Sequence, residues 1–162
     1  MSSVEKIEKV SVEQYLKYDD ALVDGKSEYF DGEIFDMAGG TVLHGMISGS
    51  IIFALRLALK GSKCVVTTSD VKVHLAASNS IAYPDIAVTC DKVEYALNRK
   101  DILSNPKLIV EVLSPSTNGF DRGSKFQKYQ SLGSLREYVL VEQGHYQVDV
   151  FFLGADGQWL FN

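Results

Sequence analysis

The chain has 162 residues, of which 46% are hydrophobic and 23% charged, and its net charge is −5 at pH 7. This length is enough for one compact domain with its own core, whereas two domains would each be unusually small. No apolar run approaches the roughly 20 residues of a membrane-spanning helix. Residues 1–6 lack the basic and then apolar layout of a signal peptide. We therefore expect a single domain over residues 1–162, located in the cytoplasm and without a membrane partner.

The two cysteines, Cys64 and Cys90, are far apart in the sequence and form no CxxC pair. This spacing is typical of buried free thiols in a reducing compartment rather than of a disulfide framework or a zinc site. We therefore expect two free cysteines.

The charge is unevenly distributed along the chain. Residues 1–55 carry 4 Lys/Arg and 10 Asp/Glu, residues 56–136 carry 12 and 7, and residues 137–162 carry 0 and 4. The middle segment is the only basic part, and a polyanion such as DNA would be attracted there. A solvated surface with uneven charge explains the same numbers, so charge alone does not decide between the two readings.

Three elements are expected in the first part of the chain. Residues 11–14 (SVEQ) form a capping box, which predicts a short helix through about Lys17. Residues 27–35 form two β-like runs joined by Asp31-Gly32, which predicts a β-hairpin. Apolar residues then recur at helical spacing over residues 42–60, until Gly61 ends the predicted long helix.

The second part of the chain alternates strand patterns with one more helix. Strands are expected at residues 64–69, 71–75, 81–89 and 108–113, with a polar connection over 91–105. A loop at 114–119 and a helix at 123–132 precede a closing strand pair at 137–142 and 146–153. This order predicts an α/β or α+β fold with a mixed central sheet, flanked by helices and preceded by the N-terminal helix and hairpin.

Two carboxylates lie within apolar strand patterns. Glu111 is in the middle of the run 108–113, and Asp85 lies in the run 83–89 directly after Pro84. Because a buried charge needs a partner, a shifted pKa or a metal, both residues are candidate metal ligands. On neighbouring strands they would come within about 5 Å of each other. Oxygen ligands without His or Cys favour Mg²⁺ or Mn²⁺ over zinc.

Each acid also has an ordinary structural explanation. Asp85 would cap a turn after Pro84, which cannot donate a hydrogen bond within a sheet. Glu111 would pair with a buried Lys or Arg. The residues alone leave both alternatives open.

Two lysines follow on the next predicted helix. Lys125 and Lys128 are three residues apart and so share a helix face, and Asp121 lies four residues before Lys125. An ammonium group near Glu111 would stabilise the negative charge that develops during phosphodiester cleavage. Both would otherwise be ordinary surface lysines, and spacing alone does not separate them.

At these residues the chain resembles a known family. The segments that carry the resemblance are spread over nearly the whole chain: 28–33 (EYFDGE), 37–41 with His44, 69–73, 83–85 (YPD), 108–117 (LIVEVLSPST), 121–126 and 135–141. They are similar to the Uma family of predicted restriction endonucleases, within the PD-(D/E)xK nuclease superfamily. The resemblance implies a mixed central sheet flanked by helices and a DNA endonuclease that hydrolyses phosphodiester bonds with a water activated by Mg²⁺ or Mn²⁺.

The resemblance also implies roles for individual residues. Asp85 and Glu111 match the metal-binding acids, and Lys125 matches the family's lysine on the following helix. Leu113 stands where the superfamily usually has its lysine. The second-tier candidates are Glu28, Lys128, His44, Asp70 and Asp121, and the residues expected to contact nucleic acid are Lys72, Arg122 and Lys128.

Three further expectations accompany this reading. Nucleases of this kind often act as homodimers, so a homodimer is one expectation. Relatives usually continue beyond the point that matches Asn162, which implies a closing strand or helix missing from this chain. Leu113 in the lysine position leaves open a catalytically inactive nucleic-acid-binding protein, and the acidic ends of the chain leave open an oligomeric scaffold protein.

Overall fold

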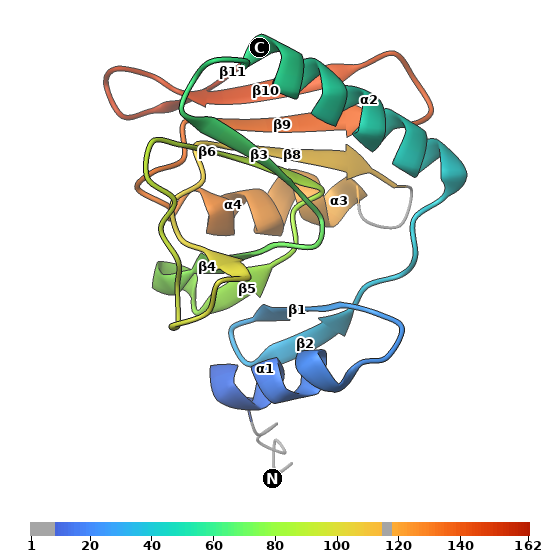
Figure 1. Ribbon diagram of the computed structural model, residues 1–162, viewed down its shortest axis with the longest axis vertical. Helices are drawn as coiled ribbons and strands as arrows, with labels where there is room; N and C mark the ends of the chain where they lie inside the picture. The colour runs from blue at the N-terminus through green and yellow to red at the C-terminus, as the bar shows by residue number, and fades with distance from the viewer. Residues whose placement is uncertain (1–8, 115–117) are drawn as a thin grey trace, which may run out of the picture.

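The computed structural model describes residues 9–114 and 118–162, in which two β-sheets are arranged with helices on their faces (Figure 1). Residues 1–6, for which the absence of a signal peptide is expected, lie outside the described residues. Residues 115–117, half of the predicted loop at 114–119, lie outside them as well. The α+β class and the mixed sheet flanked by helices are confirmed.

The N-terminal elements follow the sequence prediction closely. α1 (Val12–Ala21) begins with the capping box, in which Ser11 Oγ accepts from Gln14 N–H at 3.2 Å and Gln14 Oε1 accepts from Ser11 N–H at 2.8 Å. The helix continues past Lys17 to Ala21. The hairpin of β1 (Ser27–Phe30) and β2 (Glu33–Asp36) turns at Asp31-Gly32, where both residues have positive φ, as a tight hairpin turn requires.

The smaller sheet has the strand order β2-β1-β5-β4-β7. It adds β4 (Lys72–Leu75), β5 (Ser80–Ala82) and β7 (Ile102–Leu103) to the hairpin, and the 3₁₀ turn η1 (Ala76–Ser78) connects β4 to β5. β7 lies within the predicted polar connection 91–105 and pairs in parallel with β4. That part of the prediction is wrong, because a two-residue strand is too short to leave an alternating pattern.

The larger sheet has the order β11-β10-β9-β8-β6-β3. Its strands are β3 (Cys64–Thr68), β6 (Ile86–Cys90), β8 (Leu108–Leu113), β9 (Glu137–Glu142), β10 (Val148–Leu153) and β11 (Trp159–Phe161). β8 and β9 are parallel and the other pairs are antiparallel. The predicted strands at 108–113 and 137–142 are confirmed, and β11 was not predicted.

The predicted strand at 81–89 is wrong in one respect, since it is two strands in two different sheets. β5 belongs to the smaller sheet and β6 to the larger, and Tyr83-Pro84-Asp85 connects them. Pro84 has no N–H to donate, which favours a break in the strand at this point. The break carries the chain from one sheet to the other immediately before Asp85.

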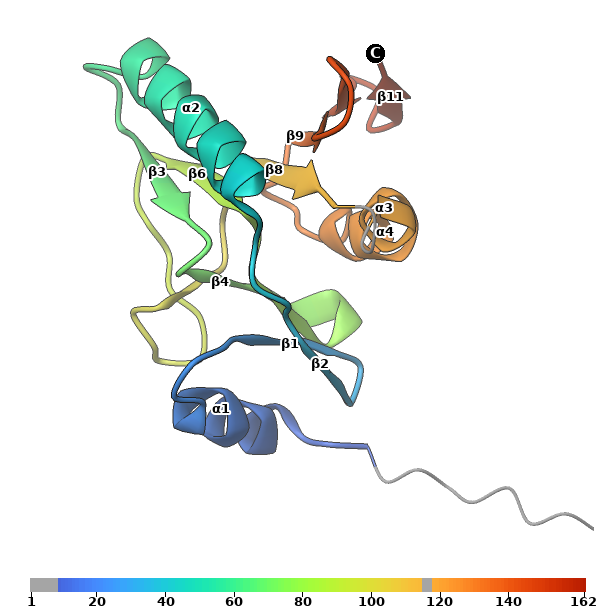
Figure 2. The same cartoon turned by 90° about the vertical axis from the view of Figure 1, so that its right-hand side faces the viewer.

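α2 (Val42–Ala58) packs on one face of the larger sheet (Figure 2). Its inner side, with Ile51, Ile52 and Leu55, contacts a cluster that includes Val66 and Ile86. Its outer side is also apolar, and the exposed residues there are Leu43, Met46, Phe53 and Leu57. Across residues 9–114 and 118–162, no helix combines the length and apolar character needed to cross a bilayer.

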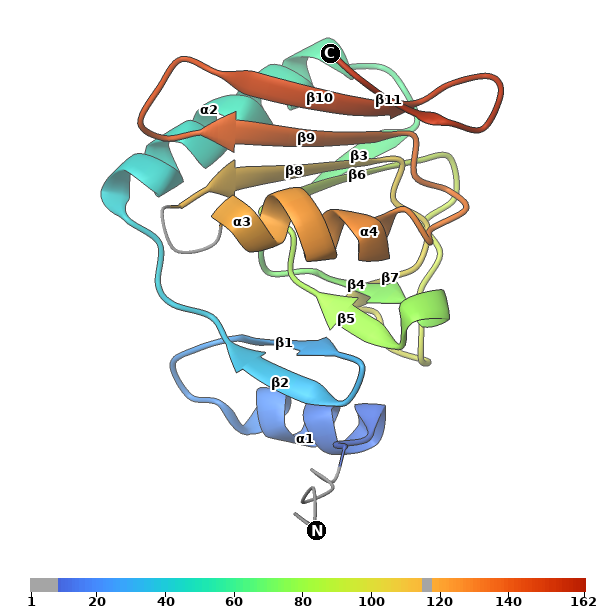
Figure 3. The same ribbon diagram turned by 180° about the vertical axis from the view of Figure 1, so that it is seen from behind.

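The opposite face of the larger sheet is covered by a short irregular helix (Figures 2 and 3). It consists of α3 (Asn118–Phe120), the π-helical turn η2 (Asp121–Lys125) and α4 (Phe126–Tyr129). The predicted helix at 123–132 therefore begins and ends earlier than expected and contains a π turn. Such turns are rare and often occur at functional sites. Phe126 anchors this helix by stacking on Tyr138 of β9, with ring centroids 4.8 Å apart.

The expectation of two free cysteines is wrong. Cys64 of β3 and Cys90 of β6 are directly opposite in the antiparallel register and form a disulfide. Two cysteines 26 residues apart give no signal of this pairing in sequence. The pairing depends on the register of the two strands.

We expect removal of this disulfide to lower the free energy of unfolding by about 3 kcal/mol, because the cross-link closes a loop of 26 residues in the unfolded chain. Urea unfolding with and without reductant measures the effect. In the double variant Cys64→Ala/Cys90→Ala the reductant should change nothing. Two titratable thiols in the denatured, unreduced protein would contradict the disulfide.

Candidate functional site

The structure brings the two predicted acids together at the junction between the sheets. β6 and β8 pair with Ile86 opposite Val110, and continuing this register by one residue places Asp85 opposite Glu111. The Asp85 N–H donates to Glu111 Oε2 at 3.2 Å, and the Val112 N–H donates to Asp85 Oδ2 at 2.7 Å. Each acid is therefore held by the backbone of the segment that carries the other.

Glu111 is almost completely buried, with 3% of its surface exposed. Lys125 Nζ lies 2.9 Å from its Oε1, and the Tyr129 hydroxyl donates to the same oxygen at 3.3 Å. Burial raises the pKa of the Glu111 carboxyl well above its ordinary value, and nearby Asp85 adds to the rise, while Lys125 opposes it. Keeping this carboxylate ionised thus depends on positive charge beside it.

Lys125 is also buried and is surrounded by acids. Its Nζ lies 2.9 Å from Glu111, 3.0 Å from Glu28 and 3.7 Å from Asp121. Burial alone lowers the pKa of an ammonium group, but the carboxylates of Glu111 and Glu28 outweigh it and raise the pKa of Lys125 well above its ordinary value. The surrounding carboxylates therefore favour the charged form of Lys125 at the centre of the site.

The alternative in which Glu111 pairs with a buried lysine is thus realised, and the partner is the lysine that the family resemblance indicates. Leu113, two residues after Glu111, is 1% exposed and belongs to the apolar core. In this structure the ammonium beside Glu111 comes from η2 and not from β8.

Glu28 joins the site from the smaller sheet. It lies on β1 with 7% of its surface exposed, and its Oε1 accepts from the Tyr83 N–H at 2.8 Å as well as from Lys125. The second-tier candidates Glu28 and Asp121 are therefore both in contact with Lys125.

His44 lies at the more exposed side of the site. Its Nε2 is 3.1 Å from Asp85 Oδ2, and the side chains of His44 and Asp85 are 22% and 14% exposed. Thr41 caps α2 by accepting from the His44 N–H at 3.1 Å. Gly40 leaves room for the imidazole, because an added Cβ would lie 3.2 Å from His44 Nδ1. A ligand would reach Asp85 and His44 before Glu111 and Lys125.

The remaining candidates lie elsewhere. Asp70 forms a surface ion pair with Lys26 at 2.6 Å, and Lys128 lies over the Phe30 ring, 5.6 Å from its centroid. Arg122 forms ion pairs with Glu142 and Asp149. Lys72 is 4% exposed and paired with Asp19 and Asp101, so its ammonium does not face a surface that DNA could approach.

The donor set fits a magnesium-type ion better than a zinc-type ion. Among residues 9–114 and 118–162, no group of three or more His, Cys, Asp and Glu is arranged to hold a metal. Mg²⁺, however, is commonly bound through one or two carboxylates with water and substrate phosphate as the other ligands. Asp85 and Glu111 supply such a pair, and Glu28 and Asp121 place two further carboxylates beside the Lys125 ammonium.

Tyr129 is the member of the site that sequence reasoning missed. It lies four residues after Lys125 on the same helical segment, is fully buried and donates to Glu111. The i, i+4 spacing from Lys125 could have indicated it.

Comparison with known proteins identifies one family that matches almost the whole chain and two similar proteins. The family Uma2, described as "Putative restriction endonuclease", matches residues 12–161. Two proteins of Synechocystis sp. (strain ATCC 27184 / PCC 6803 / Kazusa), both described as uncharacterized, are similar to this chain. The protein slr1290 is 36% identical over 152 residues, which are 94% of this chain and 78% of that protein. The protein sll1609 is 33% identical over 147 residues, which are 91% of this chain and 82% of that protein.

A solved structure shares the fold. It is described as a "putative nuclease belonging to DUF820" from Anabaena variabilis ATCC 29413 and superposes with a TM-score of 0.74 at 16% identity. The match covers 94% of this chain and 83% of that one. Since the family match spans nearly the whole chain, including all of the residues that build the site, the chain belongs to the Uma2 family of restriction endonuclease-like proteins.

Proposed function

We propose that this protein is a DNA endonuclease that depends on Mg²⁺ or Mn²⁺ and hydrolyses phosphodiester bonds. The observation that carries the proposal is the meeting of Asp85 and Glu111 across β6 and β8 with Lys125 Nζ 2.9 Å from Glu111. Membership of a nuclease-like family supports it.

In this proposal Asp85 and Glu111 hold the divalent cation. When bound, such a cation lowers the pKa of a water molecule and neutralises charge on a phosphoryl oxygen. Asp85 Oδ2 is fixed by the Val112 N–H and His44, while within the described residues Asp85 Oδ1 makes no hydrogen bond. That oxygen is therefore available at the exposed side of the site.

Lys125 has two tasks in this proposal. It favours the ionised form of the buried Glu111 and so opposes the effect of burial, and it supplies a positive charge close to the point where the phosphate becomes more negative in the transition state. Glu28 of β1 and Asp121 of η2 itself hold the Lys125 ammonium in place. His44 orients the Asp85 carboxylate and lies where a DNA phosphate would enter.

A thermal titration tests the metal site independently of cleavage. We expect Mg²⁺ and Mn²⁺ to raise the melting temperature and EDTA to reverse the rise, because a ligand bound only by the native state stabilises it. The same ions should support nicking of plasmid DNA. DNA binding without cleavage in either ion would instead support an inactive binding protein, and a melting temperature insensitive to both ions would overturn the metal site.

The cytoplasmic location and the homodimer stay predictions. The disulfide between Cys64 and Cys90 is a feature more typical of oxidising compartments. Sedimentation of the purified protein determines its oligomeric state.

A further inference from the structure

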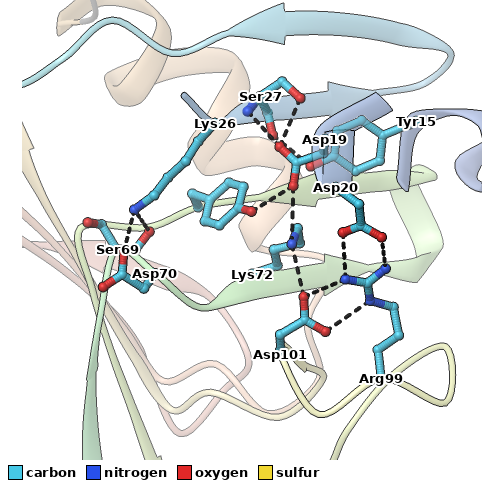
Figure 4. Close-up of polar contacts among 11 residues, drawn as sticks. Tyr15, Asp19, Asp20, Lys26, Ser27, Ser69, Asp70, Lys72, Arg99 and Asp101 are labelled. Atoms are coloured by element: carbon cyan, nitrogen blue, oxygen red, sulfur yellow. Dashed lines mark hydrogen bonds and ion pairs between the residues drawn. The ribbon is translucent and has the colours of Figure 1, made fainter. Parts of the chain in front are cut away.

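A second cluster of charged residues lies between α1 and the smaller sheet (Figure 4). Asp19 of α1 and Lys72 of β4 are both buried, with 7% and 4% of their surfaces exposed. Towards solvent, Arg99 forms ion pairs with Asp20 and Asp101, and Asp101 also contacts Lys72. None of these contacts touches Asp85, Glu111 or Lys125 directly.

Each oxygen of the Asp19 carboxylate contacts two polar groups, which come from β1, β4 and the segment between β5 and β6. Its Oδ1 accepts from the Ser27 N–H at 2.8 Å and from the Ser27 hydroxyl at 3.0 Å. Its Oδ2 accepts from the Tyr83 hydroxyl at 2.7 Å and lies 3.1 Å from Lys72 Nζ. One buried carboxylate therefore connects β1 with the segment between β5 and β6.

Two of the three partners of Asp19, Ser27 and Tyr83, lie close in sequence to residues of the site. Ser27 directly precedes Glu28, and Tyr83 lies two residues before Asp85 with Pro84 between them. The Tyr83 N–H donates to Glu28 Oε1 at 2.8 Å. Because proline restricts the backbone, a shift of Tyr83 would be passed on to Asp85 with little loss.

Lys72 holds the same tyrosine from another side. Its Nζ lies 4.9 Å from the centroid of the Tyr83 ring while it contacts Asp19 and Asp101. Burial and the hydrogen bond to Asp19 raise the pKa of the Tyr83 hydroxyl, so this group stays a donor. Buried ion pairs seldom add net stability, so a role in fixing geometry accounts better for this arrangement.

We propose that Asp19 and Lys72 are positioning residues of the candidate nuclease site, which hold Tyr83 and Ser27 so that Asp85 and Glu28 meet Glu111 and Lys125. The inference rests on the proposed function for its effect on cleavage. Its effect on geometry does not depend on that function.

The variant Tyr83→Phe tests this most cleanly. It removes the hydroxyl bound to Asp19 and leaves the ring, the backbone N–H to Glu28 and the Asp19–Lys72 pair. The variant Asp19→Asn removes one of the two negative charges that neutralise the buried Lys72, so this variant is the one at risk of misfolding. Tyr29→Phe is the matched control, because Tyr29 is a buried tyrosine on β1 whose hydroxyl bonds Val10 and Asn79 and not Asp19.

We expect kcat for DNA cleavage to fall about tenfold in Tyr83→Phe, and the Mn²⁺ concentration for half-maximal stabilisation to rise about tenfold, as for other groups that orient metal ligands. KM for DNA should stay within about twofold, because the hydroxyl does not face the substrate. Tyr29→Phe should lose comparable stability and keep wild-type kcat and Mn²⁺ dependence.

Amide hydrogen exchange separates this inference from the proposed function. In Tyr83→Phe, and not in Tyr29→Phe, exchange at Tyr83, Asp85 and Val112 should quicken about fivefold, since these amides bond the site carboxylates. If exchange is faster in Tyr83→Phe but the protein neither binds metal nor cleaves DNA, the proposed nuclease function is contradicted and the positioning role is retained. Unchanged exchange, or equal effects in both tyrosine variants, would overturn the positioning role.

Discussion

Metal-dependent cleavage is expected to fall at least about 100-fold in Asp85→Asn and in Glu111→Gln. Each substitution keeps the shape of the side chain and removes a charge that would hold the cation. The cation contributes several kcal/mol of transition-state stabilisation, so its loss has a large effect on the rate. Nicking of plasmid DNA over a series of Mn²⁺ concentrations measures the loss. The rise in melting temperature with Mn²⁺ should disappear in parallel.

The fold should tolerate these changes. Glu111→Gln removes a carboxylate whose pKa burial raises, and Lys125 keeps Glu28 and Asp121 as partners. We therefore expect the free energy of unfolding in EDTA to change by less than about 1 kcal/mol. Asp91→Asn is the control, since Asp91 directly follows β6 as Asp85 directly precedes it, and it should cleave DNA at the wild-type rate. Wild-type cleavage by purified Asp85→Asn or Glu111→Gln would refute the assigned site.

Lys125→Met is expected to have the largest effect on stability. The substitution leaves Glu28, Glu111 and Asp121 without their shared ammonium, and an unpaired buried charge costs about 3–5 kcal/mol. The loss at pH 7 should shrink at pH 5, because the uncompensated carboxyls take up protons in the folded state and that uptake is easier in acid. Urea unfolding at both pH values measures the loss of stability. Cleavage of DNA should be lost as well.

A divalent cation offers a second check on Lys125→Met. Mn²⁺ should restore part of the lost stability, because it supplies positive charge to the same carboxylates. The control is Lys107→Met. Lys107 Nζ lies 3.8 Å from Asp91 Oδ2 at the surface, so the free energy of unfolding should change by less than about 1 kcal/mol in this variant. Equal losses in the two lysine variants would mean that Lys125 is not the counterion of the site.

The local signals in the sequence were reliable where neighbouring residues decide the structure. The capping box at Ser11 starts α1, and Asp31-Gly32 turns the hairpin, because both depend on bonds and torsions within a few residues. The register of β6 and β8 was not readable, and the predicted strand at 81–89 ran through Pro84, where the chain passes from one sheet to the other. The π turn at Asp121–Lys125 gave no periodic signal, so the limits of the helix at 123–132 were misplaced.

Errors arose where residues far apart in the chain meet. Cys64 and Cys90 pair only because β3 and β6 are aligned in one register, and Lys72 is buried only because α1 brings Asp19 over β4. Neither contact leaves a trace in composition or spacing. Glu28 differs, since the family resemblance named it as a second-tier candidate, but its contact with Lys125 also joins residues that are far apart in the chain.

The sequence by itself determined that two acids lie in apolar stretches and that a lysine follows on a helix, because residue patterning and side-chain chemistry are local properties. The tertiary structure alone decided that Asp85 faces Glu111, that Lys125 is shared by three acids and that Asp19 reaches both supporting segments. These contacts require two sheets and two helical segments, α1 and η2, to pack together, and packing of that kind is fixed by the whole chain and not by any window of it.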